Sequence, residues 1–175
     1  MVQLILVRHG IALAREEFQK KAKLDDAFRP LTVKGRSRLE RMTKVMKRRW
    51  VKDVDLILSS PYTRARQSAE IVSQIYNEQR IVECSELVPQ SPPQAFVRWI
   101  KSQNFRGNIF VIVGHEPNLS LLATYLLAGN EYPFLQFKKS GIMMLEVDML
   151  KGLGPSSAQL QWLVTPKMIL DEREK

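Results

Sequence analysis

Three short and almost entirely apolar runs are each followed at once by a cluster of polar residues. The runs cover residues 3–7, 54–58 and 109–113. A run of this length with an abrupt polar stop is typical of a strand that is buried on both faces, as in a parallel sheet. Segments with helical spacing of apolar residues lie between the runs. Because strands that alternate with helices pack as layers, the sequence predicts an α/β fold whose sheet is mostly parallel at its centre.

The segments around these runs predict the remaining elements. Thr32 is a suitable N-cap for one helix, and Pro61 suits the first turn of another, where its missing N–H costs nothing. Residues 12–31 have no clear period and are expected to form a long excursion. The predicted helices cover residues 33–50, 61–76, 94–102 and 117–127, and further strands are expected at 81–83, 141–148 and 158–164, the last two as a hairpin with a turn rich in glycine and proline.

The length of 175 residues suits a single domain, because domains cluster near about 100–150 residues. One cysteine excludes a disulfide framework and fits a reducing compartment. No apolar stretch approaches the roughly 20 residues that a membrane-spanning helix needs, and the first apolar run meets Arg8 too soon for a secretion signal. We therefore expect one domain over residues 1–175, in the cytoplasm and without a membrane partner.

The chain is basic, with 27 lysine and arginine residues against 18 aspartate and glutamate residues and a formal net charge of +9. Such a balance attracts anions, so phosphate compounds, acidic proteins and nucleic acids are candidate partners. The densest basic segment, residues 34–52, favours a helix with a solvated basic face over a docking surface for an acidic partner. Nucleic acid is disfavoured because this segment has little aromatic content beyond Trp50. Lys138 and Lys139 are expected on an exposed turn rather than at the border of a pocket.

Both histidines of the chain lie in the polar clusters that end two of the apolar runs. His9 follows the first run within Arg8-His9-Gly10, and His115 follows the third run. In an open α/β sheet, the carboxyl ends of parallel strands meet at one edge, where ligands bind. A lone histidine is more often structural than catalytic, but two at equivalent strand ends, with none elsewhere, favour a shared site.

The cluster after the second run supplies a cation for the same edge. In the helix predicted from Pro61, Arg64 falls at the border of the buried face, whereas Arg66 falls on the polar face. The alternative for Arg64 is a helix cap or a surface ion pair. Together, Arg8, Arg64 and the two histidines form a cationic set that suits a tetrahedral dianion such as phosphate, and an imidazole can attack phosphorus as a nucleophile.

Other phosphate chemistries fail simple tests against the sequence. Cys84 is followed six positions later by Gln90, so the Cys-x5-Arg loop of cysteine phosphatases is missing. A Gly-x4-Gly-Lys-Ser/Thr phosphate loop is also missing. The Asp53-Val54-Asp55 segment precedes its apolar run, whereas the motif of an aspartyl phosphatase follows one. The two histidines have no nearby His or Cys at metal-ligand spacing, so we expect no metal and no cofactor.

These residues resemble the motifs of a known family. Leu6-Val7-Arg8-His9-Gly10 resembles the signature of the histidine phosphatase superfamily, whose fold is phosphoglycerate mutase-like. Residues 59–69 and 113–118 resemble its second and third motifs, in the same order, and residues 29–35 are most similar to the small SixA-type phosphohistidine phosphatases. The resemblance implies a three-layer α/β/α sandwich, His9 as the nucleophile, and ligands of the phosphoryl group at Arg8, Arg64 and His115.

Glu86 is the one carboxylate near the place where larger members of the superfamily carry a general acid. The Gly-x-x-Glu-Gly continuation of that motif is absent, so Glu86 is either the acid or a solvated loop carboxylate. A weak acid suffices when imidazole leaves, because its pKa is about 6.5, whereas an alkoxide needs a strong acid. The sequence therefore predicts a phosphohistidine phosphatase that acts on a phosphorylated protein. The alternatives are a phosphatase for a small phosphomonoester and a non-catalytic module that recognises phosphate.

Overall fold

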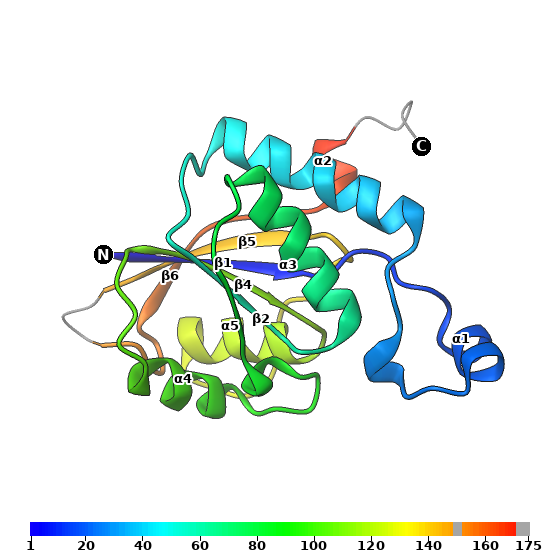
Figure 1. Ribbon diagram of the computed structural model, residues 1–175. Helices are drawn as coiled ribbons and strands as arrows, with labels where there is room; N and C mark the ends of the chain where they lie inside the picture. Colours follow the sequence, from blue (N-terminus) through cyan, green and yellow to red (C-terminus); the bar gives the residue numbers. More distant parts are fainter. Residues whose placement is uncertain (149–151, 171–175) are drawn as a thin grey trace.

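The computed structural model describes residues 1–148 and 152–170, and within them the chain forms a six-stranded sheet. The strands are β1 (Val2–Arg8), β2 (Leu56–Ser59), β3 (Ile81–Glu83), β4 (Ile109–Gly114), β5 (Ile142–Val147) and β6 (Ala158–Val164). Their order is β3-β2-β4-β1-β5-β6, in which the first four are parallel and β5 runs antiparallel to both of its neighbours (Figure 1). The predicted α/β fold with a mostly parallel centre is confirmed. In the predicted hairpin of β5 and β6, the part of the turn at residues 149–151 lies outside the described residues.

Helices cover both faces of the sheet, which is therefore the middle of three layers. The helices are α1 (Arg15–Ala22), α2 (Val33–Arg49), α3 (Thr63–Ile75), α4 (Pro93–Ser102), α5 (Asn118–Ala128) and α6 (Pro166–Ile169). Figure 1 shows α2 and α3 on one face, α4 and α5 on the other, and α1 beside the layers at the right of the view. None of the helices within the described residues has the length and apolarity that crossing a membrane requires.

Alternate residues of β1 pack into two different hydrophobic cores. Leu4 and Leu6 belong to the core that includes residues of α4 and α5, whereas Ile5 and Val7 belong to the core of α2 and α3. All four side chains are at most 1% exposed. Burial on both faces is the physical reason why the strand lacks polar alternation. Each fully buried aliphatic side chain of this kind contributes about 1.5–3 kcal/mol to the stability of the fold.

The parallel register brings the ends of three strands level at one edge of the sheet. Arg8 on β1 pairs with Gly114 on β4, and Ser59 on β2 pairs with Val113 on β4. The backbone N–H of His9 donates to the carbonyl oxygen of Gly114 at 3.1 Å. The polar clusters that follow β1, β2 and β4 therefore lie side by side, as the sequence predicted.

The helix after β2 begins two residues later than the sequence predicted. α3 begins at Thr63, and Tyr62, with extended backbone angles, is its N-cap, so Pro61 does not lie in the first helical turn. The hydroxyl of Ser60 accepts a hydrogen bond from the N–H of Tyr62 and also contacts His115. The segment before α3 thus brings the side chains of Ser60 and Tyr62 against His115 at the sheet edge.

Residues 12–31 form an excursion that is closed at its base. A backbone bridge joins Ala12 to Leu31, and the N–H of Thr32 donates to the carbonyl oxygen of Ile11 at 2.9 Å. Between these residues lie α1 and a short 3-10 turn at Asp26–Phe28. The sequence did not predict these two elements because the segment has little apolar periodicity.

Two glycines allow the backbone after β1 to touch the first turn of α2. A Cβ atom on Gly35 would lie 2.0 Å from the carbonyl oxygen of Ile11, and one on Gly10 would lie 2.8 Å from the carbonyl oxygen of Gly35. Only glycine, which has no Cβ atom, fits at such a close approach. The backbone that carries His9 is therefore held directly against α2.

Candidate active site

The two histidine rings lie next to each other at the sheet edge, with their centroids 5.0 Å apart. Nδ1 of His9 lies 2.7 Å from the carbonyl oxygen of Gly10. A carbonyl oxygen only accepts, so Nδ1 carries the proton and Nε2 of the neutral ring keeps its lone pair. Nε2 has no hydrogen-bond partner in the part of the chain that the structure describes. His9 is thus held in the tautomer that a nucleophile requires.

Burial keeps both imidazoles uncharged. Desolvation, with added repulsion from Arg64 and Arg8, lowers the pKa of His9 to about 3, although the hydrogen bond to Gly10 opposes this shift. Desolvation and the proximity of His9 and Arg64 lower the pKa of His115 to about 2. An unperturbed histidine has a pKa of about 6.5. Both rings are therefore neutral at physiological pH, and His9 needs no separate base before it attacks an electrophile.

The ring of His115 is held by two residues of the segment that precedes α3. Its Nε2 lies 2.8 Å from Oγ of Ser60, and the ring of Tyr62 meets it edge-on with the centroids 5.2 Å apart. Because a hydroxyl both donates and accepts, Ser60 permits the tautomer of His115 that carries its proton on Nδ1. Nδ1 is buried and has no partner among the described residues. This nitrogen is therefore available to an oxygen atom of an anion.

The guanidinium of Arg64 lies 5.1 Å from the ring centroid of Tyr62, which packs against His115, and Arg8 precedes His9 and pairs with Gly114, the residue before His115. The charges of both arginines lower the pKa of each histidine. Nη1 of Arg8 donates to the carbonyl oxygen of Phe137 at 2.6 Å. Arg64 is only 3% exposed, and its Nη1 donates to the carbonyl oxygen of Asp26 at 2.7 Å. Nε of each arginine is buried without a partner among the described residues. The structure thus brings together the four predicted residues and leaves donors on them that a bound anion can satisfy.

A carboxylate that the sequence analysis did not single out occupies part of this site. Oδ2 of Asp26 lies 3.1 Å from Nη2 of Arg64, and Oδ1 lies 2.7 Å from Nε of Arg29 and 3.1 Å from Nε of Arg15. Desolvation opposes ionisation of Asp26, but the hydrogen bonds from Arg15 and Arg29 and the charge of Arg64 hold its pKa well below the usual range. No sequence signal distinguishes Asp26 from the other acidic residues of the excursion, because its role depends on the turn at 26–28.

Glu86, the predicted candidate for the general acid, lies just after β3. That strand is separated from β1 by β2 and β4. The half-buried carboxylate accepts hydrogen bonds from Sγ of Cys84 at 3.3 Å and from Oγ of Ser85 at 3.2 Å. The contacts that the structure gives Glu86 are therefore within its own turn, which favours the interpretation as a loop carboxylate.

Glu116 is a second carboxyl group at the site that the sequence analysis missed, although it directly follows His115. Oγ of Ser120 donates to one oxygen, and the other oxygen is buried without a partner among the described residues. Burial raises the pKa of Glu116, while the bond from Ser120 and the charge of Arg8 oppose this shift. A buried carboxyl with a raised pKa beside a cation is a candidate proton donor.

No group of three or more His, Cys, Asp or Glu side chains suited to a metal ion occurs in residues 1–148 and 152–170.

The neutral state of His9 predicts a loss of stability in mild acid. The unfolded chain protonates this histidine below about pH 6.5, whereas the folded protein keeps it neutral down to about pH 3. Between these values the unfolded state binds more protons, so the free energy of unfolding falls as the pH falls. At pH 5 the contribution of His9 to this loss is about 2 kcal/mol. We expect urea unfolding of the wild type to show a lower free energy of unfolding at pH 5 than at pH 7. In His9→Gln we expect this decrease to be smaller by about 2 kcal/mol. An equal drop in both proteins would contradict the neutral state.

Residues 4–88 match the family model described as histidine phosphatase superfamily (branch 1). The matched segment contains Arg8, His9, Arg64 and Glu86, and His115 lies beyond it. An uncharacterized protein from Picosynechococcus sp. is 29% identical over 170 residues, which are 97% of this chain and 99% of that protein.

Solved structures of phosphatases share the fold. The protein histidine phosphatase SixA complexed with tungstate has a TM-score of 0.76 and 24% identity, covering 94% of this chain and 97% of that chain. A mycobacterial glucosyl-3-phosphoglycerate phosphatase has a TM-score of 0.69 and 13% identity, covering 93% and 98% of the two chains. A phosphoserine phosphatase from Entamoeba histolytica in complex with phosphoserine has a TM-score of 0.67 and 16% identity, covering 97% and 100%. The match of the family model over residues 4–88 confirms the predicted resemblance, and the solved structures confirm the predicted three-layer fold.

Proposed function

We propose that this chain, which carries the motifs and the fold of the histidine phosphatase superfamily, removes phosphate from phosphohistidine on a protein. The observation that carries the proposal is the state of His9, a buried and neutral imidazole whose Nδ1 is held by Gly10 and whose Nε2 is unprotonated. Arg8 and Arg64 supply positive charge, and the neutral ring of His115 supplies a hydrogen-bond donor at Nδ1, so that the three residues bind the phosphoryl oxygens and stabilise the charge of the transition state.

The proposed reaction has two steps. Nε2 of His9 attacks phosphorus, so that a P–N bond to His9 forms while the P–N bond to the substrate imidazole breaks. The other nitrogen of the substrate imidazole takes a proton from solvent, so the electron pair of the broken bond leaves on a neutral imidazole. Water then attacks the phosphoryl group, a P–O bond forms, and the P–N bond to His9 breaks to release inorganic phosphate and a proton. The covalent intermediate divides one difficult displacement into two easier ones.

The surroundings of the carboxyl groups favour a phosphoramidate substrate. Glu86 is bound within its own turn, so the proposed mechanism does not depend on it as a strong acid. An imidazole leaving group with a pKa of about 6.5 needs little assistance, whereas an alkoxide needs a general acid. The second candidate function is a phosphatase for a small phosphomonoester, and the observation that favours it is the raised pKa of Glu116 beside Arg8.

The proposal places the protein in the cytoplasm, where it would reverse the phosphorylation of a signalling protein without a metal ion. The single cysteine of the sequence fits that reducing compartment. A histidine nucleophile and two guanidinium groups provide nucleophile and charge without a metal. A module that only recognised phosphate would have no use for an unprotonated Nε2 on His9.

A comparison of substrates tests this function. The kcat/KM for a phosphohistidine peptide is expected to exceed the values for phosphoserine and glucose 6-phosphate by about 10²-fold or more. General acid catalysis typically contributes a factor of this size, and hydrolysis of the two phosphomonoesters would lack it. Faster turnover of either phosphomonoester would make the second candidate the function. Binding of phosphate without turnover of any substrate would support the recognition module.

The variant Glu86→Gln distinguishes between the two interpretations of Glu86, a loop carboxylate and a general acid. Because its contacts lie within its own turn, we expect turnover of the phosphohistidine peptide within about threefold of wild type, and equally little change on phosphoserine. Glu83→Gln, which removes an exposed carboxylate on neighbouring β3, is the matched control. A loss of about 10²-fold on phosphoserine in Glu86→Gln alone would identify Glu86 as the acid.

A further inference from the structure

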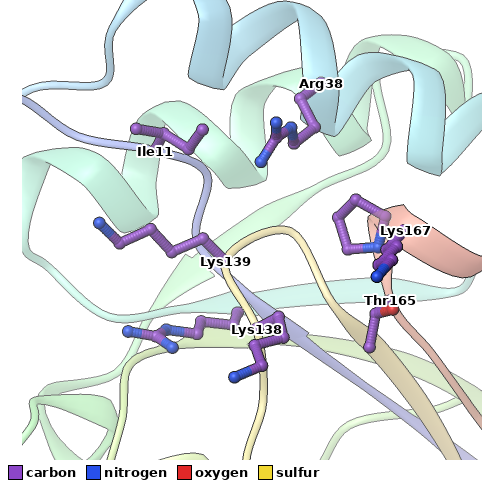
Figure 2. A pocket seen from close by; sticks show the side chains of 8 residues that line it. Ile11, Arg38, Lys138, Lys139, Thr165 and Lys167 are labelled. Atoms are coloured by element: carbon purple, nitrogen blue, oxygen red, sulfur yellow. The ribbon is translucent and has the colours of Figure 1, made fainter. Parts of the chain in front are cut away.

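A cavity of about 550 Å³ lies beside the candidate active site, and Arg8 belongs to both. Among the described residues, its lining includes five cationic side chains and no acidic one. These cations, which we call the basic pocket, are Arg8, Arg38, Lys138, Lys139 and Lys167. Figure 2 shows that they come from separate parts of the chain, with Arg38 on α2, the two lysines on the turn before β5, and Lys167 on α6. The fold therefore assembles positive charge here that is dispersed along the sequence.

Apart from Arg8, which interacts with the charge of Glu116, the cations of the basic pocket have no ionic partner among the described residues. Nζ of Lys138 lies 3.3 Å from the amide oxygen of Gln136. Arg38, Lys139 and Lys167 make no ion pair within the described residues. Like charges held together without counter-charges repel one another, so such a cluster is costly unless an anion binds to it.

The charge of the basic pocket is continuous with that of the phosphoryl site. Burial and the positive charges of Arg8, Arg29 and Arg64 lower the pKa of Lys139. Further along α2, by contrast, Lys44 is already paired with Glu40 at 2.5 Å. The helix that the sequence analysis treated as one solvated basic face thus has one cation at the cavity and another that is neutralised on the surface.

We propose that the basic pocket binds acidic side chains of the phosphorylated protein, next to the phosphohistidine whose phosphoryl group lies at Arg8. This inference rests on the proposed function and adds the recognition of the partner. The cavity is far larger than a single carboxylate or phosphate. Guanidinium and ammonium groups both bind carboxylates, and two arginines and three lysines spread around a cavity of this size suit several carboxylates in varied positions better than one phosphate. Complementary charge of this kind gives specificity and fast association.

Paired peptides test the proposal. One phosphohistidine peptide carries glutamates on both sides of the phosphohistidine, and the other carries glutamines. The triple variant Arg38→Gln/Lys138→Gln/Lys167→Gln removes three pocket charges and leaves Lys139, which is coupled to the catalytic arginines, in place. We expect KM for the glutamate peptide to rise about tenfold or more, with kcat within about twofold, and both kinetic constants for the glutamine peptide to stay within about twofold.

The control removes the same number of charges from exposed positions away from the cavity, in Arg48→Gln/Arg49→Gln/Lys101→Gln. We expect this variant to leave the KM for the glutamate peptide within about twofold of wild type. An equal rise for both peptides in the triple variant, or an equal rise in the control, would overturn the proposal. Tighter binding of fructose 1,6-bisphosphate than of the glutamate peptide, lost in the triple variant, would also overturn it in favour of a second phosphate.

The dissociation constants of the unphosphorylated peptides decide the inference independently of turnover. Tighter binding of the glutamate peptide to wild type, weakened in the triple variant only, supports the basic pocket even if neither phosphopeptide is hydrolysed. Equal binding of both peptides refutes the inference and leaves the proposed function standing if the phosphopeptides are hydrolysed.

Discussion

His9→Ala is expected to lose about 10³-fold or more of kcat on a phosphohistidine peptide, because the nucleophile of the proposed reaction is removed. Wild type incubated with peptide labelled with ³²P, and denatured in alkali to preserve P–N bonds, is expected to carry label on the protein. The label is expected to be stable in alkali and labile in acid, as a phosphorylated histidine is. His9→Ala is expected to carry none.

His115→Gln is the matched control, because His115 is the other of the two histidines in the chain. It keeps the proposed nucleophile, so slow turnover with label still on His9 is expected. Retention of label in His9→Ala together with its loss in His115→Gln would assign the nucleophile to His115. Label and full activity in His9→Ala would contradict covalent catalysis at His9.

Arg64→Ala is expected to lower kcat/KM by about 10²-fold or more, the usual consequence of removing a group that stabilises charge in the transition state. Arg66→Ala, two residues away on α3, is the control because it makes the same chemical change on the exposed face. The side chain of Arg66 is 54% exposed and pairs with Glu83 at 2.8 Å. An exposed pair of this kind contributes at most about 1 kcal/mol, so activity is expected within about twofold of wild type.

Thermal unfolding of both variants accompanies the kinetic measurement. Arg64→Ala leaves Asp26 with Arg15 and Arg29, so the carboxylate keeps two of its three cations. We therefore expect both variants to remain folded at the assay temperature. Similar losses of activity in the two variants, or a larger loss in Arg66→Ala, would contradict the placement of Arg64 at the phosphoryl group.

The sheet was predictable because its strands are buried on both faces. An apolar run such as residues 3–7 has no polar alternation, and its polar stop at Arg8 marks the strand end, so both the strand and its functional edge follow from the pattern. The start of α3 was not predictable from Pro61. The segment before it includes Ser60, which contacts His115, and these two residues lie far apart in the sequence and meet only across the sheet edge.

The candidate site was predictable where a residue sits at a strand end or on a periodic helix. His9, His115 and Arg64 meet those conditions, and the structure brings them together. Asp26 meets neither, because it lies in a turn of the excursion and reaches Arg64 only in the folded chain. The sequence analysis did not place Lys139 at a pocket for the same reason. Its place in the lining of the cavity depends on residues of α2 and α6 that lie beside the turn only in the folded chain.

The closed base of the excursion has a consequence for how such a chain can diversify. The bridge between Ala12 and Leu31 and the contact of Gly35 with Ile11 fix both ends of the segment, whatever lies between them. Each doubling of the length of a flexible loop costs only about 0.6 kcal/mol of closure entropy. Evolution or design is therefore free to lengthen, shorten or replace α1 beyond Arg15, and with it the shape presented to a partner, while the backbone that carries His9 keeps its position on the layers beneath.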